Sequence, residues 1–190
     1  PLPNRRIGMA ANRLQDQVSL ALIKRKSAKY PQARFIPNYK QAKRVLLAYP
    51  SEVSASDLQE LERFAADLES DRIKVVQSVY FNTKDKNLLP LVSKPNRYHW
   101  GRWDFDRFQF PMSDELWHLL RGDTFDLFIS ADSSQDLRIA AMAATVNAAC
   151  KIGRYHKPFE RFYNILIQEP NSTGLSQYLR DVKTHIKHLG

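Results

Sequence analysis

Hydrophobic and polar positions alternate from residue 44 onward in a way that predicts strands and helices in turn. Residues 44–49 form a short, continuous apolar run, which is typical of a parallel strand buried on both faces. Pro50 and Ser51 break this run, and apolar positions at helical spacing follow over 58–68. A second apolar run covers 73–81. The order strand, helix, strand predicts a βαβ unit and therefore a parallel sheet.

The same alternation continues to the end of the chain. Further elements are predicted at 125–129 (strand), 134–149 (Ala-rich helix), 151–153 (short strand), 163–167 (strand) and 174–189 (amphipathic helix). Residues 82–110 show no regular period, so we expect irregular structure there. The pattern predicts an α/β fold: a Rossmann-like, three-layer domain with a mostly parallel sheet over 43–190, preceded by a basic N-terminal helix.

Residues 1–42 are predicted to form a helical arm and a linker. Apolar residues recur at spacings of four and three, the pattern of one helical face, at Ile7, Ala11, Leu14, Val18 and Ala21. We expect this face either to pack on the body or to dock elsewhere. The helix should end near 24–26, because cations suit the C-terminal end of the helix dipole. Pro31 and Pro37 then bracket an extended linker.

Charge is distributed unevenly along this chain of net charge +9. Residues 1–44 hold eleven Lys and Arg residues against one acid, a net charge of +10, whereas the remainder holds eighteen against nineteen. This asymmetry predicts a polyanionic partner for the arm. No apolar stretch approaches the ~20 residues of a membrane span. The single cysteine, Cys150, is expected to be a small buried thiol, which suits a reducing compartment and a cytoplasmic location.

An arginine-rich aromatic segment, residues 97–110, is the most unusual stretch of the sequence. It interleaves six aromatic residues with Arg97, Arg102 and Arg107. Such a segment can form a stacking platform for single-stranded bases, with the arginines following the phosphates. Alternatively, its aromatic residues fill the core. Asp104 and Asp106, two apart in an assumed strand, would share a face, either as an acid/base or metal pair or as surface partners of arginine.

Together these features predict a set of nucleic-acid-binding residues: Arg5, Arg6, Arg13, Lys24, Arg25, Lys26, Lys29, Arg97, Arg102 and Arg107. The first hypothesis is accordingly a non-enzymatic protein that associates with RNA, either ribosomal or another structured RNA.

A candidate cleft follows the predicted strand at 125–129, because ligands of open α/β sheets lie beyond the carboxyl ends of strands. It comprises Ser130, Asp132, Ser133 and Ser134. Asp132 would act as a base or orient a hydroxyl, and the serines would contact a phosphate or simply cap the next helix. The chain has no G-x-G-x-x-G and no G-x-x-x-x-G-K-[ST] motif, so no cofactor is expected. No metal is expected either, because His185 and His188 lack a third ligand.

Two resemblances add to this interpretation. The strand at 125–129, the Ala-rich helix and the sequence Lys151-Ile152-Gly153-Arg154 resemble the acceptor-side half of heptosyltransferase-like glycosyltransferases over about residues 124–154. Most of the chain resembles an uncharacterised family of small proteins from the Bacteroides lineage. Its shared features are the basic helix, Trp100, Trp103, the Phe-Asp-Leu strand, the Ile-Gly turn, residues 162–167 and Tyr178-Leu179.

The resemblances imply a Rossmann-like fold and a second hypothesis, and the basic amphipathic arm allows a third. The second is an enzyme, or a degenerate enzyme, resembling the acceptor half of a GT-B sugar transferase, with Asp132 and Ser133 lining its site. The third is an adaptor whose arm docks on a protein complex or a membrane surface.

Overall fold

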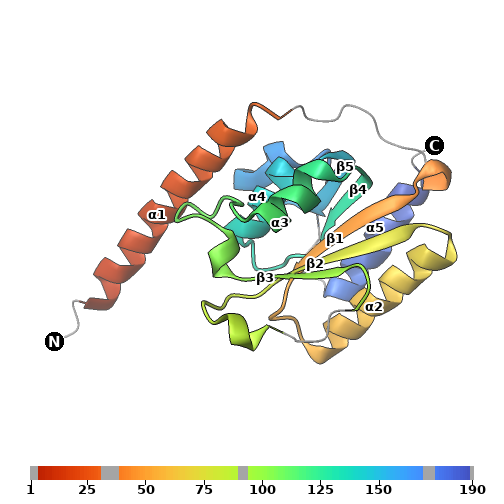
Figure 1. Ribbon diagram of the computed structural model, residues 1–190, viewed down its shortest axis with the longest axis horizontal. Helices are drawn as coiled ribbons and strands as arrows, with labels where there is room; N and C mark the ends of the chain where they lie inside the picture. The colour runs from red at the N-terminus through yellow and green to blue at the C-terminus, as the bar shows by residue number, and fades with distance from the viewer. Residues whose placement is uncertain (1–3, 31–38, 90–93, 169–173, 189–190) are drawn as a thin grey trace.

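The centre of the molecule is a six-stranded, all-parallel sheet (Figure 1). The computed structural model describes residues 4–30, 39–89, 94–168 and 174–188, with side chains from residue 14 onward. The strands are β1 (Arg44–Pro50), β2 (Lys74–Tyr80), β3 (Arg97–Trp100), β4 (Phe125–Ser130), β5 (Ala148–Arg154) and β6 (Ile165–Ile167). Their order across the sheet is β3-β2-β1-β4-β5-β6. The predicted Rossmann-like α/β fold is therefore confirmed.

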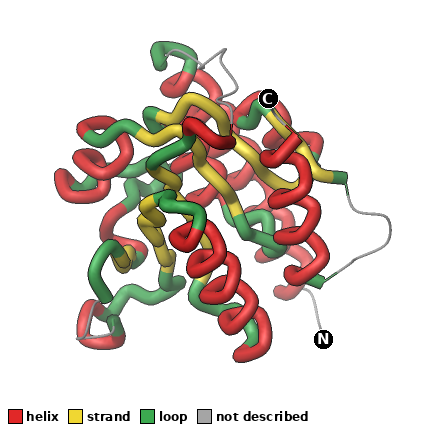
Figure 2. Tube along the Cα trace, turned by 90° about the vertical axis from the view of Figure 1, so that its right-hand side faces the viewer, coloured by secondary structure: helices red, strands yellow, loops and turns green. Residues whose placement is uncertain are grey.

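Helices cover both faces of this sheet (Figures 1 and 2). The α-helices are α1 (Asn4–Ser27), α2 (Ala55–Ser70), α3 (Asp114–Trp117), α4 (Leu137–Thr145) and α5 (Leu175–His188). Shorter helical turns are η1 (Tyr39–Gln41), η2 (Lys86–Leu88), η3 (Arg102–Asp104), η4 (His118–Gly122) and η5 (Lys157–Phe162). Helices α2 and α5 pack together on one face, and α3 and α4 lie on the other, with α1 outside α4. Within the described ranges, no helix is both long enough and apolar enough to cross a membrane.

The two central strands show why a continuous apolar run forms a strand here. β1 and β4 pair in parallel, with Val45 opposite Leu127 and Ala48 opposite Ser130. Both strands are almost entirely buried, because helices cover them from both sides. The chain leaves β1 in one direction toward β2 and β3, and later returns to β4 on the other side of β1. The sheet therefore reverses its winding direction between β1 and β4.

Helix α4 is shorter than the sequence pattern predicts. Ala residues favour a helix through 149, but α4 ends at Thr145 and the chain enters β5 at Ala148. Ala148 pairs with Phe125, and Cys150 pairs with Leu127. Helix propensity is a weak preference, and strand pairing in the middle of a sheet overrides it. Small side chains suit both environments, since every α4 residue from Ile139 to Thr145 is buried.

Strand β3 lies in the region predicted to be irregular. It is an edge strand of four residues that pairs only with β2. Its burial is uneven: Tyr98 is 43% exposed, whereas Trp100, two residues further on the same face, is 3% exposed. A short strand with one neighbour has no continuous apolar run, which explains why the sequence pattern did not predict it.

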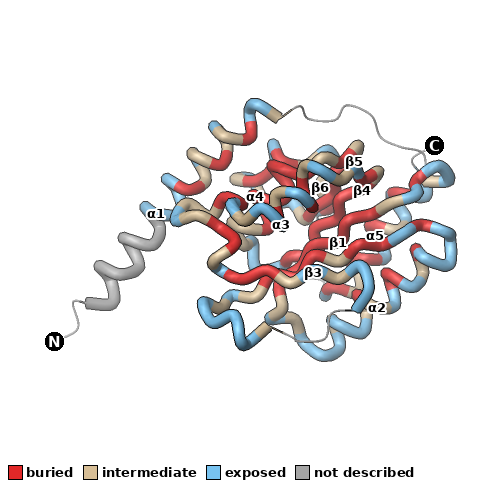
Figure 3. Tube along the Cα trace, in the orientation of Figure 1, coloured by how far each residue is buried: buried red, intermediate tan, exposed pale blue. Residues whose placement is uncertain are grey.

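Helix α1 packs on the body through a different face from the predicted apolar one. Ser19, Ile23 and Ser27 are buried, whereas Leu14 and Val18 are 63% and 44% exposed. The prediction that the apolar stripe packs on the body is therefore wrong in the described half. The physical reason is the partner surface: α4 is rich in alanine, and small serines permit close approach around Ile23. Residues 14–18 are all exposed, so α1 leaves the body ahead of Ser19 (Figure 3).

Candidate functional site

A crevice lies at the carboxyl edge of the sheet, where its winding reverses. It consists of two adjoining pockets of about 530 Å³ each, which share Ser133, Asp136 and Arg154. One pocket lies beyond β4, β5 and β6, and we call it the aromatic lobe. The other lies beyond β1 and β4, and we call it the carboxylate lobe. The four predicted cleft residues all line this crevice, with Ser130 and Asp132 in the first lobe, Ser134 in the second and Ser133 in both.

The loop between β4 and α4 is organised by the Asp132 carboxylate. Its oxygens accept hydrogen bonds from the Ser134 backbone N–H (2.7 Å), the Ser134 hydroxyl (2.6 Å) and the Asp136 backbone N–H (2.7 Å). These bonds lie on either side of Gln135, which adopts a left-handed conformation with φ of 59°. Burial raises the pKa of Asp132, and the hydrogen bonds partly offset that effect. The geometry thus makes Asp132 a positioning residue for the loop.

The cap of α4 differs from the predicted one. Asp136 is the N-cap residue, and its side chain accepts the Arg138 backbone N–H at 2.7 Å. The interpretation that Ser133 or Ser134 caps this helix is wrong, because the helix begins at Leu137, three residues later than the pattern suggests. The Asp136 carboxylate also forms an ion pair with Arg138 at 3.2 Å.

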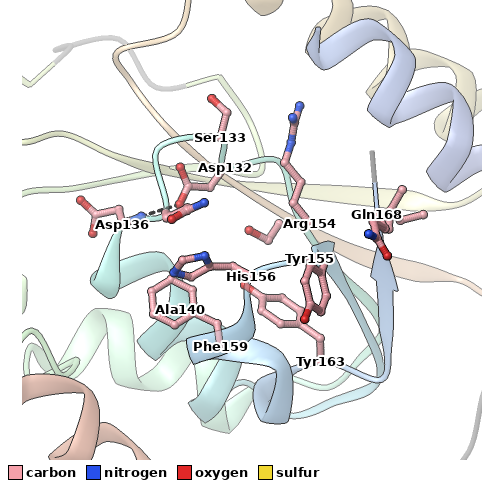
Figure 4. A pocket seen from close by; sticks show the side chains of 13 residues that line it. Asp132, Ser133, Asp136, Ala140, Arg154, Tyr155, His156, Phe159, Tyr163 and Gln168 are labelled. Carbon is pink, nitrogen blue, oxygen red and sulfur yellow. Dashed lines mark hydrogen bonds between the residues drawn. The ribbon is translucent and has the colours of Figure 1, made fainter. Parts of the chain in front are cut away.

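The wall of the aromatic lobe comes from β5 and the residues that follow it (Figure 4). His156 packs edge-on against Phe159, with ring centroids 4.7 Å apart. Burial lowers the pKa of His156, although the nearby Asp132 opposes the shift, so the imidazole is mainly neutral at pH 7. The Arg154 guanidinium lies 4.5 Å from the centre of the Tyr178 ring. The Tyr178 hydroxyl in turn donates to the Ser130 carbonyl at 2.7 Å.

Tyr163 completes this wall because β5 carries a glycine beside it. A Cβ atom at Gly153 would lie only 2.5 Å from the Tyr163 ring, so a larger residue there would displace the ring. Burial raises the pKa of the Tyr163 hydroxyl, which therefore stays protonated and can donate or accept a hydrogen bond. The Ile-Gly pair that the sequence analysis noted thus has a structural role in the pocket.

The carboxylate lobe is bounded by the segment after β1 and the start of α2. Its lining includes Glu52, Asp57 and Asn82. Ser54 caps α2: its hydroxyl accepts the Asp57 backbone N–H at 3.1 Å and donates to the Asp57 carboxylate at 2.8 Å. In the part of the chain that the structure describes, no group of three or more His, Cys, Asp or Glu side chains could hold a metal ion.

Sequence reasoning did not include several residues of the crevice. No local motif marks these residues. Glu52 follows β1, Arg154 ends β5, and His156 and Tyr163 lie between β5 and β6. The sequence signal that could have found them is their position just after the end of a predicted strand. The same rule that selected Ser130 would select Glu52 and Arg154 once the strand order is known.

Two neighbouring residues on β5 are buried, and neither faces the crevice. Cys150 is a buried thiol, as predicted, and burial raises its pKa to about 11. Lys151 is 2% exposed, and its Nζ donates to the Ala143 carbonyl at 2.7 Å. Burial and the nearby Arg121 lower the pKa of Lys151 to about 8. Lys151 thus binds a carbonyl of α4.

The predicted basic residues of the arm fall into different environments. Arg5, Arg6 and Arg13 lie on α1, ahead of the residues whose side chains the structure describes. Arg25 and Lys29 are exposed, and Lys24 is partly buried. Lys26 is tied to the body by an ion pair with Asp106 at 2.8 Å, and its Nζ lies 4.5 Å from the centre of the Phe110 ring.

In the arginine-rich aromatic segment, the three arginines have partners within the fold. Arg97 forms an ion pair with Glu62, and its Nε donates to the Gln77 side chain at 2.9 Å. Arg102 donates to the Asn82 side chain at 2.8 Å, and the Arg107 guanidinium lies 4.5 Å from the centre of the Phe108 ring. Arg97 and Arg102 lie at opposite ends of β3, so they do not form one patch.

The two acids of this segment do not form a pair on a strand, which corrects the sequence interpretation. Asp104 belongs to η3, is buried, and accepts the Gly101 backbone N–H at 2.8 Å. Asp106 accepts the backbone N–H groups of Phe108 (2.8 Å) and Phe110 (3.0 Å) besides Lys26. A tight turn replaces the assumed strand, so both carboxylates bind the local backbone.

Fold and crevice together define the chain as a doubly wound α/β protein with an open site at its switch point. The chain belongs to a family of unknown function (DUF6913), whose model matches residues 15–189. Arg5, Arg6 and Arg13 precede the matched region. Comparison with the curated proteins and with the solved structures found no match.

Proposed function

We propose that this is a non-enzymatic binding protein that attaches to structured RNA through its basic N-terminal arm. The observation that carries the proposal is the charge at the start of α1. Arg5 and Arg6 lie in its first turn, which contains no acid. The helix dipole makes this end favourable for anions, so cations here oppose helix stability. A polyanion bound at this end would offset the repulsion between the arginines and the helix dipole. This is the physical reason to expect an anionic partner here.

The position of the arm supports the same role. Residues 14–18 are all exposed, so this stretch of α1 stands away from the body (Figure 3). Because Lys26 is held in an ion pair with Asp106, the proposed RNA-binding set on the arm excludes it. The set comprises Arg5, Arg6, Arg13, Lys24, Arg25 and Lys29.

An RNA partner fits the arm better than a membrane does. Helix α1 contains no Trp, Tyr or Phe. Helices that lie in a membrane interface use large apolar and aromatic residues to insert. Phosphate neutralisation with release of counterions requires only the cations. Ribosomal RNA, as an abundant structured RNA, is one candidate.

The test is binding of a fluorescent RNA hairpin to the full chain by anisotropy, between about 50 and about 200 mM salt. The variant carries Arg5→Gln, Arg6→Gln and Arg13→Gln. The matched control carries Lys74→Gln, Lys84→Gln and Arg161→Gln, which remove the same charge at exposed sites of the body. Each phosphate contact contributes about 0.7 to 0.9 to the slope of log K against log salt. The arm variant should therefore lose about two units of slope, and the control should lose much less.

Two results would contradict the proposal. Equal slopes for the arm variant and the wild type would show that these arginines do not contact phosphates. Equal losses in the arm variant and the control would show only nonspecific attraction. Flotation with anionic vesicles, without RNA binding, would instead assign the arm to a membrane surface.

A second role, small-molecule binding at the crevice, is supported by its place at the switch point, where doubly wound proteins bind ligands. The resemblance of residues 124–154 to the acceptor half of sugar transferases supports the same location. The engagement of Asp132 in three loop hydrogen bonds favours binding over base catalysis.

A further inference from the structure

The crevice combines two kinds of surface that meet at one point. Arg154, Ser133 and Asp136 line both lobes, so one ligand can extend from one lobe into the other. Each lobe, at about 530 Å³, falls within the range of small-molecule sites in proteins. The chemistry of the two lobes therefore specifies the two ends of the ligand.

The carboxylate lobe favours hydroxyl groups. Glu52 is exposed at its rim, and Asp57 and Asn82 lie beside it. Ionised carboxylates only accept hydrogen bonds, and a pair of neighbouring hydroxyls supplies two donors to one carboxylate. A polyol such as a ribose has this arrangement.

The aromatic lobe favours a planar ring. His156, Phe159 and Tyr163 form its wall, and Tyr155 at its rim is 46% exposed (Figure 4). Stacking of a nucleobase on an aromatic side chain is worth several-fold to a hundred-fold in affinity, and it tolerates any base. The neutral imidazole of His156 adds a polar edge without adding charge.

Both helix N-termini beside the crevice are closed to phosphate. The Asp57 N–H at the start of α2 binds the Ser54 hydroxyl, and the Arg138 N–H at the start of α4 binds Asp136. The adjoining loops, 51–54 and 131–136, contain no glycine that would let the backbone approach a phosphate.

The charge around the crevice opposes an anion as well. Four carboxylate side chains line the lobes against one guanidinium, Arg154; Asp136 is paired with Arg138, which leaves Glu52, Asp57 and Asp132 in excess. A phosphate placed between them would be repelled.

We propose that this crevice binds an uncharged ligand in which a planar ring is joined to a polyol, the chemistry of a nucleoside, and that it rejects the phosphorylated form. The ring lies against Tyr155 and Tyr163, and the hydroxyls bind the carboxylates of the other lobe. This site is separate from the arm, so it goes beyond RNA attachment.

The experiment is calorimetric titration of the full chain with adenosine, uridine, guanosine and cytidine, followed by AMP, ribose and spermidine. At least one nucleoside should bind, and its affinity should exceed that of its 5′-monophosphate by about ten-fold or more. Ribose should bind more weakly than the nucleoside, because it lacks the stacking ring.

Two variants test the two lobes separately. Glu52→Gln should lower nucleoside affinity about ten-fold, because it removes a charged hydrogen-bond acceptor. It should also reduce the ratio of nucleoside affinity to monophosphate affinity, because it removes a negative charge that repels phosphate. Glu69→Gln, at an exposed position near the end of α2, is its control. Tyr155→Ala should also lower affinity about ten-fold. Tyr98→Ala, 43% exposed on β3, is the matched aromatic control.

The proposal is overturned if none of the four nucleosides binds at millimolar concentration. It is equally overturned if AMP binds as tightly as adenosine, which would make the crevice an anion site, or if only spermidine binds, which would make it a cation site. Ribose binding as tightly as adenosine would also contradict the proposal, because the aromatic lobe would then contribute nothing to affinity. RNA binding by the arm is measured independently, so failure here leaves that proposal intact.

Discussion

The arm and the 97–110 segment are both rich in arginine, yet they use this charge in different ways. In the segment, each arginine contacts a partner from the fold, and Asp104 and Asp106 bind backbone N–H groups. In the described part of the arm helix, the corresponding ion pair is that of Lys26 with Asp106.

This difference shows that charge composition alone does not identify a binding surface. In the 97–110 segment a carboxylate neutralises Arg97, whereas Arg102 contacts an amide and Arg107 the adjacent ring. The arm has one acid, Asp16, among many cations. Cations that the fold does not neutralise remain able to attract a polyanion.

The strongest test of this comparison is removal of Trp100 from the segment. Trp100 is 3% exposed, and its Nε1 donates to the Ser78 hydroxyl at 2.9 Å. Trp100→Ala should lower the free energy of unfolding by about 3 to 5 kcal/mol, because it leaves a large cavity and removes the donor to the Ser78 hydroxyl. Urea denaturation measures this loss. Tyr98→Ala, at the exposed position beside it, should cost less than about 1 kcal/mol and leave RNA affinity unchanged. Weakened RNA binding by Tyr98→Ala would restore the stacking-platform interpretation.

Lys151 is the extreme case of a cation held inside the fold. Its pKa is lowered from 10.5 to about 8, so between these values the unfolded chain binds more protons than the folded protein. The stability of the wild type relative to Lys151→Met should therefore rise between pH 8 and pH 10.5, by an amount on the order of 3 kcal/mol. Denaturation at several pH values gives this difference, and Lys74→Met is the control for loss of an exposed lysine. Parallel curves for the wild type and Lys151→Met would contradict the prediction.

The smallest effect is expected where the two regions meet, at Lys26. Lys26→Gln should lower stability by less than about 1 kcal/mol, because the ion pair with Asp106 is partly exposed. Burial opposes the ionisation of Asp106, but hydrogen bonds from Lys26 and two backbone N–H groups hold its pKa below the ordinary 3.8. The loss should therefore be present at neutral pH and disappear as the pH falls through the pKa of Asp106 in the folded protein. Arg25→Gln should instead leave stability unchanged and reduce the salt slope of RNA binding. Loss of stability in Arg25→Gln, or a reduced salt slope in Lys26→Gln, would contradict the distinction between the two kinds of cation.

The sequence predicts the parts of this fold that are buried on both sides. β1 and β4 are recognisable because helices cover both of their faces. β3 is not recognisable, because it has only four residues, one of them buried, and pairs with a single neighbour. The packing face of α1 was also missed: periodicity locates apolar residues, but the surface that receives a helix decides which face is buried. Ile23 packs against the alanines of α4. Ser19 and Ile23 are both buried, and their face of the helix lies beside the one that carries Val18.

The candidate site was predicted on one side only. Ser130 to Ser134 follow a recognisable strand, so the rule about carboxyl ends found them. The opposite walls depend on strand order, which places Glu52 after β1 and Arg154 at the end of β5 beside them. Glu52 lies 78 residues before Ser130, and Arg154 lies 20 residues after Ser134, and no local pattern encodes such contacts.

The length of α1 ahead of its contact with α4 sets a distance. The helix begins at Asn4, and Ser19 is the first buried position among its described side chains, so at 1.5 Å per residue about 22 Å of helix separate the two. A helix of this kind works as a semi-rigid spacer, whereas a flexible tail of equal length would have no fixed reach. Whatever the tip contacts is therefore held roughly two nanometres from the point where α1 meets the body.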